Sequence, residues 1–176
     1  LTYVENLISR KENFLEIGCG NGFLLEMAKN KGWENVTGVE PSIEAINQAK
    51  ENIKDKIIHS TFLPNYFKKN SYDLVFFAMV LEHVPDVNEF LSEIFQILNQ
   101  GGIIVAICHD ERHFLSRLLK NKHPIINDEH NYVFGKKTLQ KIFLKNQFKN
   151  IIINDLKNYY SFNYWLDMAP LPRIIK

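Results

Sequence analysis

The stretch that decides the fold is Phe14-Leu15-Glu16-Ile17-Gly18-Cys19-Gly20-Asn21-Gly22, which is followed by the helical pattern of Phe23 to Asn30. The compact apolar run before the glycines predicts a buried strand. Glycines at alternate positions let the backbone bend tightly and approach a ligand without Cβ atoms in the way, and the next helix presents its positive end there. The stretch therefore predicts a strand, a ligand-binding loop and a helix; the alternative is a tight turn that binds nothing.

An acidic residue ends the next predicted strand, Val36 to Val39. This residue is Glu40, 18 positions after Gly22. A carboxylate at this place in an α/β sheet can accept hydrogen bonds from both hydroxyls of a ribose, although a solvated strand-end acid is the alternative. A dinucleotide fingerprint requires a third glycine where Phe23 stands, so nicotinamide and flavin cofactors are disfavoured, and the chain lacks the lysine of a P-loop.

The alternation of strands and helices continues along the chain. We expect a short helix over 2–10, a helix from the cap Ser42 to Ile53, a strand at Ile57-Ile58, a strand from Leu74 to Met79, a helix over 87–98 that Asp86 and Glu89 cap, and a strand from Ile103 to Cys108. In the last third of the sequence, we expect a helix from His113 to Lys120 and a loop through Pro124 and His130. A helix from Thr138 to Asn146 and a strand from Ile151 to Ile153 should follow. This order predicts a doubly wound, mostly parallel, Rossmann-like α/β sheet with helices on both faces.

Size and charge narrow the class of protein. The 176 residues are 45% hydrophobic, enough for one domain over 1–176, and because the chain begins with Leu1 we expect that one or both ends have been trimmed. Lys and Arg number 21 against 20 Asp and Glu, which gives no attraction to nucleic acid or membranes, and no apolar run is long enough to span a bilayer. Cys19 and Cys108 form neither a disulfide framework nor a metal-ligand pair. We expect small-molecule chemistry in the cytoplasm.

Four segments in order resemble the class I S-adenosylmethionine-dependent methyltransferases. They are Phe14 to Gly22, Val39-Glu40-Pro41-Ser42, Tyr72 to Val75 with Val80-Leu81-Glu82-His83-Val84, and Leu98 to Gly102. The resemblance covers most of the chain and implies the class I fold, S-adenosylmethionine as cofactor and S-adenosylhomocysteine as product. It implies transfer of a methyl group to a small-molecule acceptor, whose identity the motifs do not give.

The resemblance also implies roles for individual residues. Glu16 would lie near the methionine amino group, and Glu40 would hold the ribose. The cofactor would contact the loop residues Gly18, Cys19, Gly20, Asn21 and Gly22, then Pro41 and Ser42, then Ser60, Thr61 and Phe62 beside the adenine, and Ala78, Met79 and His83 after the fourth strand. Many relatives carry an acid near the adenine where this chain has Ser60, which can form a hydrogen bond but carries no charge.

Methyl transfer from a sulfonium is an in-line displacement, and correct positioning can supply most of the acceleration. A general base is required only when the acceptor must lose a proton, and His83 is our candidate; the alternative is that Glu82 and His83 only orient the loop. His130 and Tyr132 resemble a segment that relatives place over the acceptor, but a solvent-exposed loop explains His130 equally well.

Other signals are weaker. His109 and His113 are four residues apart but lack the metalloprotease pattern, so we expect no metal. The lysines at 137, 141, 145 and 149 fit a solvated helix face better than a nucleic-acid track, and the fourth strand lacks the Asn or Asp with prolines that grips a flipped base. The aromatics between Tyr159 and Trp165 fit a core or an acceptor pocket. A non-catalytic S-adenosylmethionine-binding domain that serves a partner protein is the alternative function.

Overall fold

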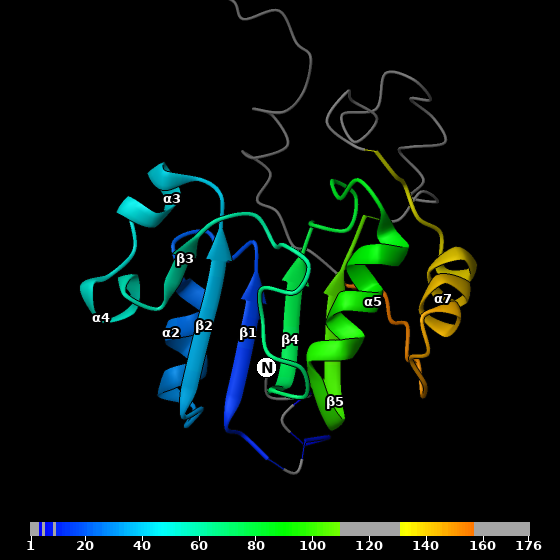
Figure 1. Cartoon of the computed structure of the whole chain (residues 1–176), viewed down its shortest axis with the longest axis horizontal. Coiled ribbons are helices and arrows are strands. Elements are labelled where there is room, and N and C mark those ends of the chain that lie inside the picture. The colour runs from blue at the N-terminus through cyan, green and yellow to red at the C-terminus, as the bar shows by residue number, and fades with distance from the viewer. Residues whose placement is uncertain (1–3, 5, 9, 110–130, 157–176) are drawn as a thin grey trace, which may run out of the picture.

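A five-stranded parallel sheet organises the molecule in the computed structural model, which describes residues 4, 6–8, 10–109 and 131–156 (Figure 1). The strands are β1 (Asn13–Ile17), β2 (Asn35–Glu40), β3 (Ile57–His59), β4 (Tyr72–Ala78) and β5 (Leu98–Ile107). Their order is β3-β2-β1-β4-β5, and every neighbouring pair is parallel. The predicted doubly wound α/β sheet is confirmed.

Helices lie on both sides of this sheet. Figure 1 shows α5 (Val87–Ile97) in front of the strands and α2 (Phe23–Asn30) behind them, with the short helices α3 (Ile43–Asn47) and α4 (Glu51–Lys54) at the β3 edge. The side chains of β1 alternate between two cores. Phe14 packs in the cluster that includes α2, and Leu15 and Ile17 pack in the cluster that includes α5. Both faces of the sheet are therefore buried, as parallel strands require.

The helix caps follow the sequence prediction. Asp86 accepts hydrogen bonds on Oδ1 from the amides of Asn88 at 2.7 Å and Glu89 at 3.1 Å, which fixes the start of α5. The Ser42 hydroxyl accepts from the Ala45 amide at 3.2 Å and starts α3. The helix predicted from Ser42 to Ile53 is nevertheless wrong as one element, because Lys50 is extended (φ −66°, ψ 147°) and separates α3 from α4.

The second half of the chain differs from the prediction in three places. α5 ends at Ile97, and β5 begins at Leu98 rather than Ile103, with a register shift opposite Tyr72 and Leu74. α7 (Lys136–Lys145) begins two residues before the predicted Thr138.

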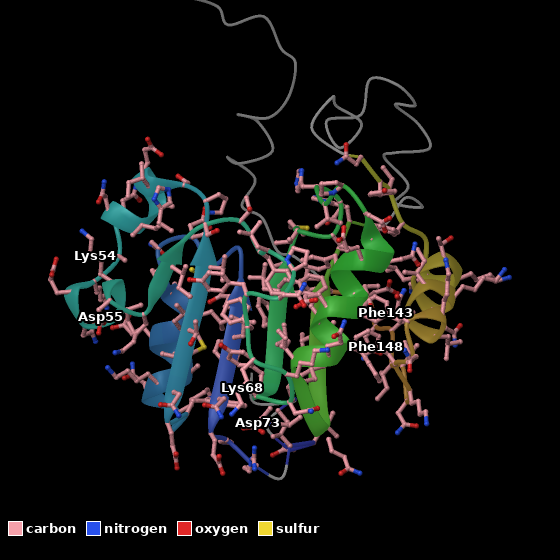
Figure 2. The ribbon with its side chains drawn as sticks, viewed as in Figure 1. Lys54, Asp55, Lys68, Asp73, Phe143 and Phe148 are labelled. Atoms are coloured by element: carbon pink, nitrogen blue, oxygen red, sulfur yellow. The ribbon has the colours of Figure 1, made fainter. Side chains whose placement is uncertain are left out.

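The strand predicted over 151–153 is wrong: this segment is irregular, and Ile152 is exposed. Its β-branched residues satisfy the sequence pattern of a strand, but that pattern reflects packing on a pleated surface and does not supply a pairing partner. The turn that follows α7 is instead held by ring packing, because the ring centroids of Phe143 in α7 and Phe148 lie 5.4 Å apart (Figure 2). The helix predicted over 113–120, the loop over 124–130 and the aromatics over 159–165 lie outside the described residues. Of the helix predicted over 2–10, residues 4, 6–8 and 10 are described; only Val4 is helical, and residues 6–8 and 10 form a turn and irregular backbone, so the prediction is wrong for these residues.

Candidate active site

The predicted cofactor residues gather at one edge of the sheet. Because all five strands are parallel, their carboxyl ends lie at the same edge, where the arrowheads point in Figure 1. The chain leaves β1 toward β2 on one side, while β4 and β5 lie on the other. This reversal of strand order is the switch point where open α/β sheets bind ligands.

Glu40 joins the end of β2 to the glycine loop. Its Oε2 accepts a hydrogen bond from the Gly20 amide at 2.8 Å, and its Oε1 accepts one from the Ser42 amide at 2.8 Å. The residue is buried, yet each carboxylate oxygen retains acceptor capacity. The carboxylate is thus held rigidly at the loop and can still accept ligand hydroxyls.

Glu16 is a buried acid with incomplete hydrogen bonding. It lies one residue before the end of β1, it is only 6% exposed, and its Oε2 has no hydrogen-bond partner among the residues that the structure describes. Burial, together with the charge of nearby Glu40, raises the pKa of Glu16 to about 8. A buried acceptor without a partner lowers the stability of the folded protein. A ligand that brings a positive charge or a hydrogen-bond donor would remove this penalty.

The glycine loop crosses the end of β2 and turns into α2. The amides of Gly18 and Cys19 both donate to the Val39 carbonyl, at 2.8 and 3.2 Å. Gly18, Gly20 and Gly22 all have positive φ, which L side chains rarely adopt. A Cβ on Gly20 would meet no atom within 4 Å, so open space lies beside this residue, whereas Gly18 and Gly22 are packed against side chains. Only Gly20 of the three offers room for a ligand.

Gly38 is a site-forming residue that the sequence analysis missed. A Cβ there would lie 2.5 Å from the Cys19 Sγ and 2.7 Å from a Leu25 methyl. Gly38 therefore allows the glycine loop and α2 to pack on β2. Its position, two residues before Glu40 inside a predicted strand, was the available signal, because a strand glycine often marks a close approach.

The predicted adenine side follows β3. The Ser60 amide donates to the Glu40 carbonyl at 3.1 Å, and the Pro41 carbonyl lies 3.0 Å from His59 Nε2. Thr61 is exposed, and Phe62 is half-buried, with its ring 5.3 Å from Phe90 and 5.8 Å from Phe67. Phe62 thus belongs partly to the α5 core, and its role toward adenine stays a prediction.

The chain turns sharply after β4. Ala78 ends the strand, and Met79 has φ 55°, an uncommon conformation for a non-glycine residue that is often found at functional sites. The Met79 amide donates to the Ile107 carbonyl of β5 at 2.8 Å. His83 is exposed on the loop that follows, and its amide donates to the Val80 carbonyl at 2.9 Å. Its catalytic role stays a prediction.

Glu82 holds this loop together, as the alternative interpretation of Glu82 and His83 in the sequence analysis proposes, although the sequence did not indicate its partners. Its carbonyl accepts from the amides of Asn131 at 2.8 Å and Tyr132 at 3.2 Å, and its Oε1 accepts from the His109 amide at 2.7 Å. The Tyr132 hydroxyl donates to the Pro85 carbonyl at 2.8 Å, so this predicted substrate residue docks on the same loop. His130 lies outside the described residues.

Two kinds of feature are absent from the part of the chain that the structure describes. Within it, no group of three or more His, Cys, Asp or Glu side chains is arranged to hold a metal ion. None of the helices in the same residues combines the length and apolar character needed to cross a membrane.

Known proteins resemble this chain in architecture and, over part of its length, in sequence. Residues 2–152 match the methyltransferase domain family. The chain is 29% identical over 108 residues to a demethylmenaquinone methyltransferase of Listeria welshimeri, covering 57% of this chain and 46% of the relative. It is 32% identical over 101 residues to a tRNA U34 carboxymethyltransferase of Nautilia profundicola, covering 53% and 33%. A crystal structure from Thermotoga maritima, described as an S-adenosylmethionine-dependent methyltransferase and possible histamine N-methyltransferase, aligns with TM-score 0.64 and 25% identity over 85% of this chain and 69% of that one.

The chain belongs to the methyltransferase domain family, and the predicted class, fold and cofactor, S-adenosylmethionine, are confirmed. It spans less than half the length of these curated relatives. The residues present fit the cofactor on two counts. The unpartnered Glu16 Oε2 suits an ammonium group, and the open space at Gly20 suits a ligand that passes close to the backbone.

Proposed function

We propose that this protein transfers the methyl group of S-adenosylmethionine to a small-molecule acceptor. The observation that carries the proposal is the buried, unpartnered oxygen of Glu16, which lies beside Glu40 at the open glycine loop. Two acids close together at a ligand edge favour a ligand that is positively charged, and S-adenosylmethionine carries both an ammonium and a sulfonium group.

Different residues of this chain would bind different groups of S-adenosylmethionine. Glu16 would accept the ammonium, and Glu40 would accept the ribose hydroxyls while its bonds to Gly20 and Ser42 keep the carboxylate in place. When bound, S-adenosylmethionine supplies a methyl group on a positively charged sulfur, which is already reactive toward a nucleophile. The protein then needs to hold the acceptor in line with that methyl group.

Several features support a small molecule as the acceptor. The demethylmenaquinone methyltransferase is named for a small molecule, and the fourth strand lacks the signature of enzymes that grip a flipped base. The tRNA-modifying relative makes RNA the competing class of acceptor. Net charge near zero weighs against a polyanionic acceptor.

Both cysteines are free thiols, which supports our expectation that the protein works in a reducing cytoplasm.

A screen for S-adenosylhomocysteine release tests this function. The chain, and the full-length protein where the gene encodes more, is incubated with S-adenosylmethionine and a metabolite library that includes quinols, phenols and amines. Unmodified tRNA forms a separate arm. We expect release with at least one small molecule and none with tRNA, and the Glu40→Ala variant should lose it. Turnover with tRNA alone would reassign the acceptor, and cofactor binding without any turnover would favour the non-catalytic domain that serves a partner.

A further inference from the structure

A buried glutamate and a histidine meet at the carboxyl ends of β4 and β5, apart from Glu16 and Glu40, the acids that we propose bind the cofactor. Glu82 is 0% exposed, and its Oε1 accepts from the His109 backbone amide at 2.7 Å and lies 3.3 Å from the His109 Nδ1. The His109 side chain is 29% exposed. The pair thus joins a fully buried carboxylate to an imidazole that solvent can reach.

Strand register explains why these residues meet. Ala78 at the end of β4 pairs with Ile107 at the end of β5, and the Met79 amide donates to the Ile107 carbonyl. His109 follows two residues beyond Ile107, and Glu82 follows the turn at Met79. Both residues therefore lie past the same sheet edge as Glu16 and Glu40, but on the β4 and β5 side of the switch point.

The chemistry of Glu82 is that of an orienting group. Hydrogen bonding of Nδ1 to the carboxylate requires the ring proton on Nδ1 and leaves Nε2 as the basic nitrogen. The second oxygen, Oε2, is buried without a partner among the described residues, so packing alone does not account for an acid here. Among the described residues, the charge of Glu82 also acts on the Cys108 thiol. Burial and this charge raise the pKa of Cys108 to about 12, so the thiol stays protonated and neutral.

We propose that His109, oriented by Glu82, is the general base that takes the proton of a hydroxyl or amine acceptor. The inference rests on the proposed methyltransferase function. The acceptor forms a bond to the methyl carbon with its lone pair, the electron pair of the broken carbon–sulfur bond stays on sulfur, and the acceptor proton moves to His109 Nε2. Glu82 is the positioning residue that stabilises the resulting imidazolium. His83, the base predicted from the sequence, then only shapes the loop.

The first test needs no acceptor. Nitrogen-15 spectra of the imidazoles are recorded at pH 8 for the wild type and for Glu82→Gln, each with saturating S-adenosylhomocysteine and then S-adenosylmethionine. We expect the Nδ1-protonated tautomer at His109 in the wild type and a shift toward the Nε2-protonated tautomer in Glu82→Gln. Replacing the neutral product by the charged cofactor should move the His109 signals and leave those of His59, at the far edge of the sheet, in place. A wild-type His109 protonated mainly on Nε2, or unresponsive to the cofactor charge, would overturn the proposal.

The second test uses the acceptor found by the release screen. His109→Gln should lower the turnover rate by roughly 10²–10⁴-fold and remove the acidic limb of its pH profile, while cofactor affinity is kept. Glu82→Gln should lower turnover less, with Glu82→Asp restoring part of it, and His83→Ala should keep the acidic limb. Loss of the limb in His83→Ala alone would transfer the role to His83. Failure to bind S-adenosylmethionine at all would instead refute the proposed function. The spectra distinguish the two outcomes, because they report cofactor binding and the tautomer of His109 separately.

Discussion

Glu16 and Glu40 differ in their hydrogen bonding, although both are buried at the same sheet edge. Glu40 is anchored by two backbone amides, whereas Glu16 keeps one oxygen without a partner. Burial disfavours the ionised form of Glu16 and raises its pKa to about 8. The pair therefore combines a fixed carboxylate with one that a bound cation would complete.

The first prediction concerns Glu40. We expect Glu40→Ala to weaken S-adenosylmethionine binding by roughly 1.5–3 kcal/mol, because the ribose loses a charged acceptor and Gly20 loses its anchor. Glu51→Ala removes an exposed acid of α4 and serves as the charge-matched control. Isothermal titration measures both. A loss below about 0.5 kcal/mol in Glu40→Ala would mean that Glu40 does not hold the ribose.

The second prediction concerns the pH dependence of stability through Glu16. Its pKa rises from an ordinary 4.5 to about 8 in the folded protein, so between these values the folded chain binds more protons at Glu16 than the unfolded chain does. The free energy of unfolding should therefore fall as pH rises through this window. Glu16→Gln should gain roughly 2–4 kcal/mol over the wild type between pH 5 and pH 9, measured by urea denaturation without cofactor. Parallel pH curves for the two proteins would contradict the raised pKa.

At the scale of elements, the glycine loop depends on backbone conformation. Gly20 and Gly32 both have positive φ and open space at the Cβ position, but Gly32 lies past the far end of α2. We expect Gly20→Val and Gly32→Val to lose similar stability, roughly 1 kcal/mol or more, because both impose a strained φ. Only Gly20→Val should weaken S-adenosylmethionine binding, and by more than tenfold. Equal affinities by titration, with both proteins folded by circular dichroism, would remove Gly20 from the site.

The packing of the loop on β2 gives a further prediction. A Cβ on Gly38 would overlap the Cys19 Sγ, so Gly38→Ala should lower the free energy of unfolding by roughly 1–3 kcal/mol. Cys19→Ala removes that sulfur, and the double variant should recover at least about 0.5 kcal/mol relative to the sum of the two single changes. Urea denaturation of the four proteins measures this coupling. Strict additivity would show that the two residues are not in contact.

The elements also show what sequence patterns can and cannot predict. The β1–loop–α2 unit, the Asp86 cap and the Glu40 position were predictable, because each depends on residues close in sequence. The contact of Glu82 with His109 was not, since it joins residues 27 apart through the register of β4 and β5. The break at Lys50 and the missing strand over 151–153 show tertiary context overriding local propensity.

At the scale of the whole molecule, a single parallel sheet carries both halves of the proposed site. The β1 and β2 ends present the acids that suit S-adenosylmethionine, and the β4 and β5 ends present Met79, Glu82 and His109. This division follows from the reversal of strand order at β1 and β4, because open α/β sheets bind ligands at the carboxyl edge of such a switch point. One domain over 1–176 stays a prediction, as does the role of His130.

The central claim is that this edge binds S-adenosylmethionine through Glu16, Glu40 and the glycine loop. Isothermal titration of the wild type and of the Glu16→Gln/Glu40→Ala double variant, with S-adenosylmethionine and separately with a nicotinamide dinucleotide, tests it most directly. We predict one S-adenosylmethionine site per wild-type chain, affinity reduced more than tenfold in the double variant, and no heat with the dinucleotide. A folded wild-type chain that binds the dinucleotide, or that binds S-adenosylmethionine as tightly after both acids are replaced, would contradict the account.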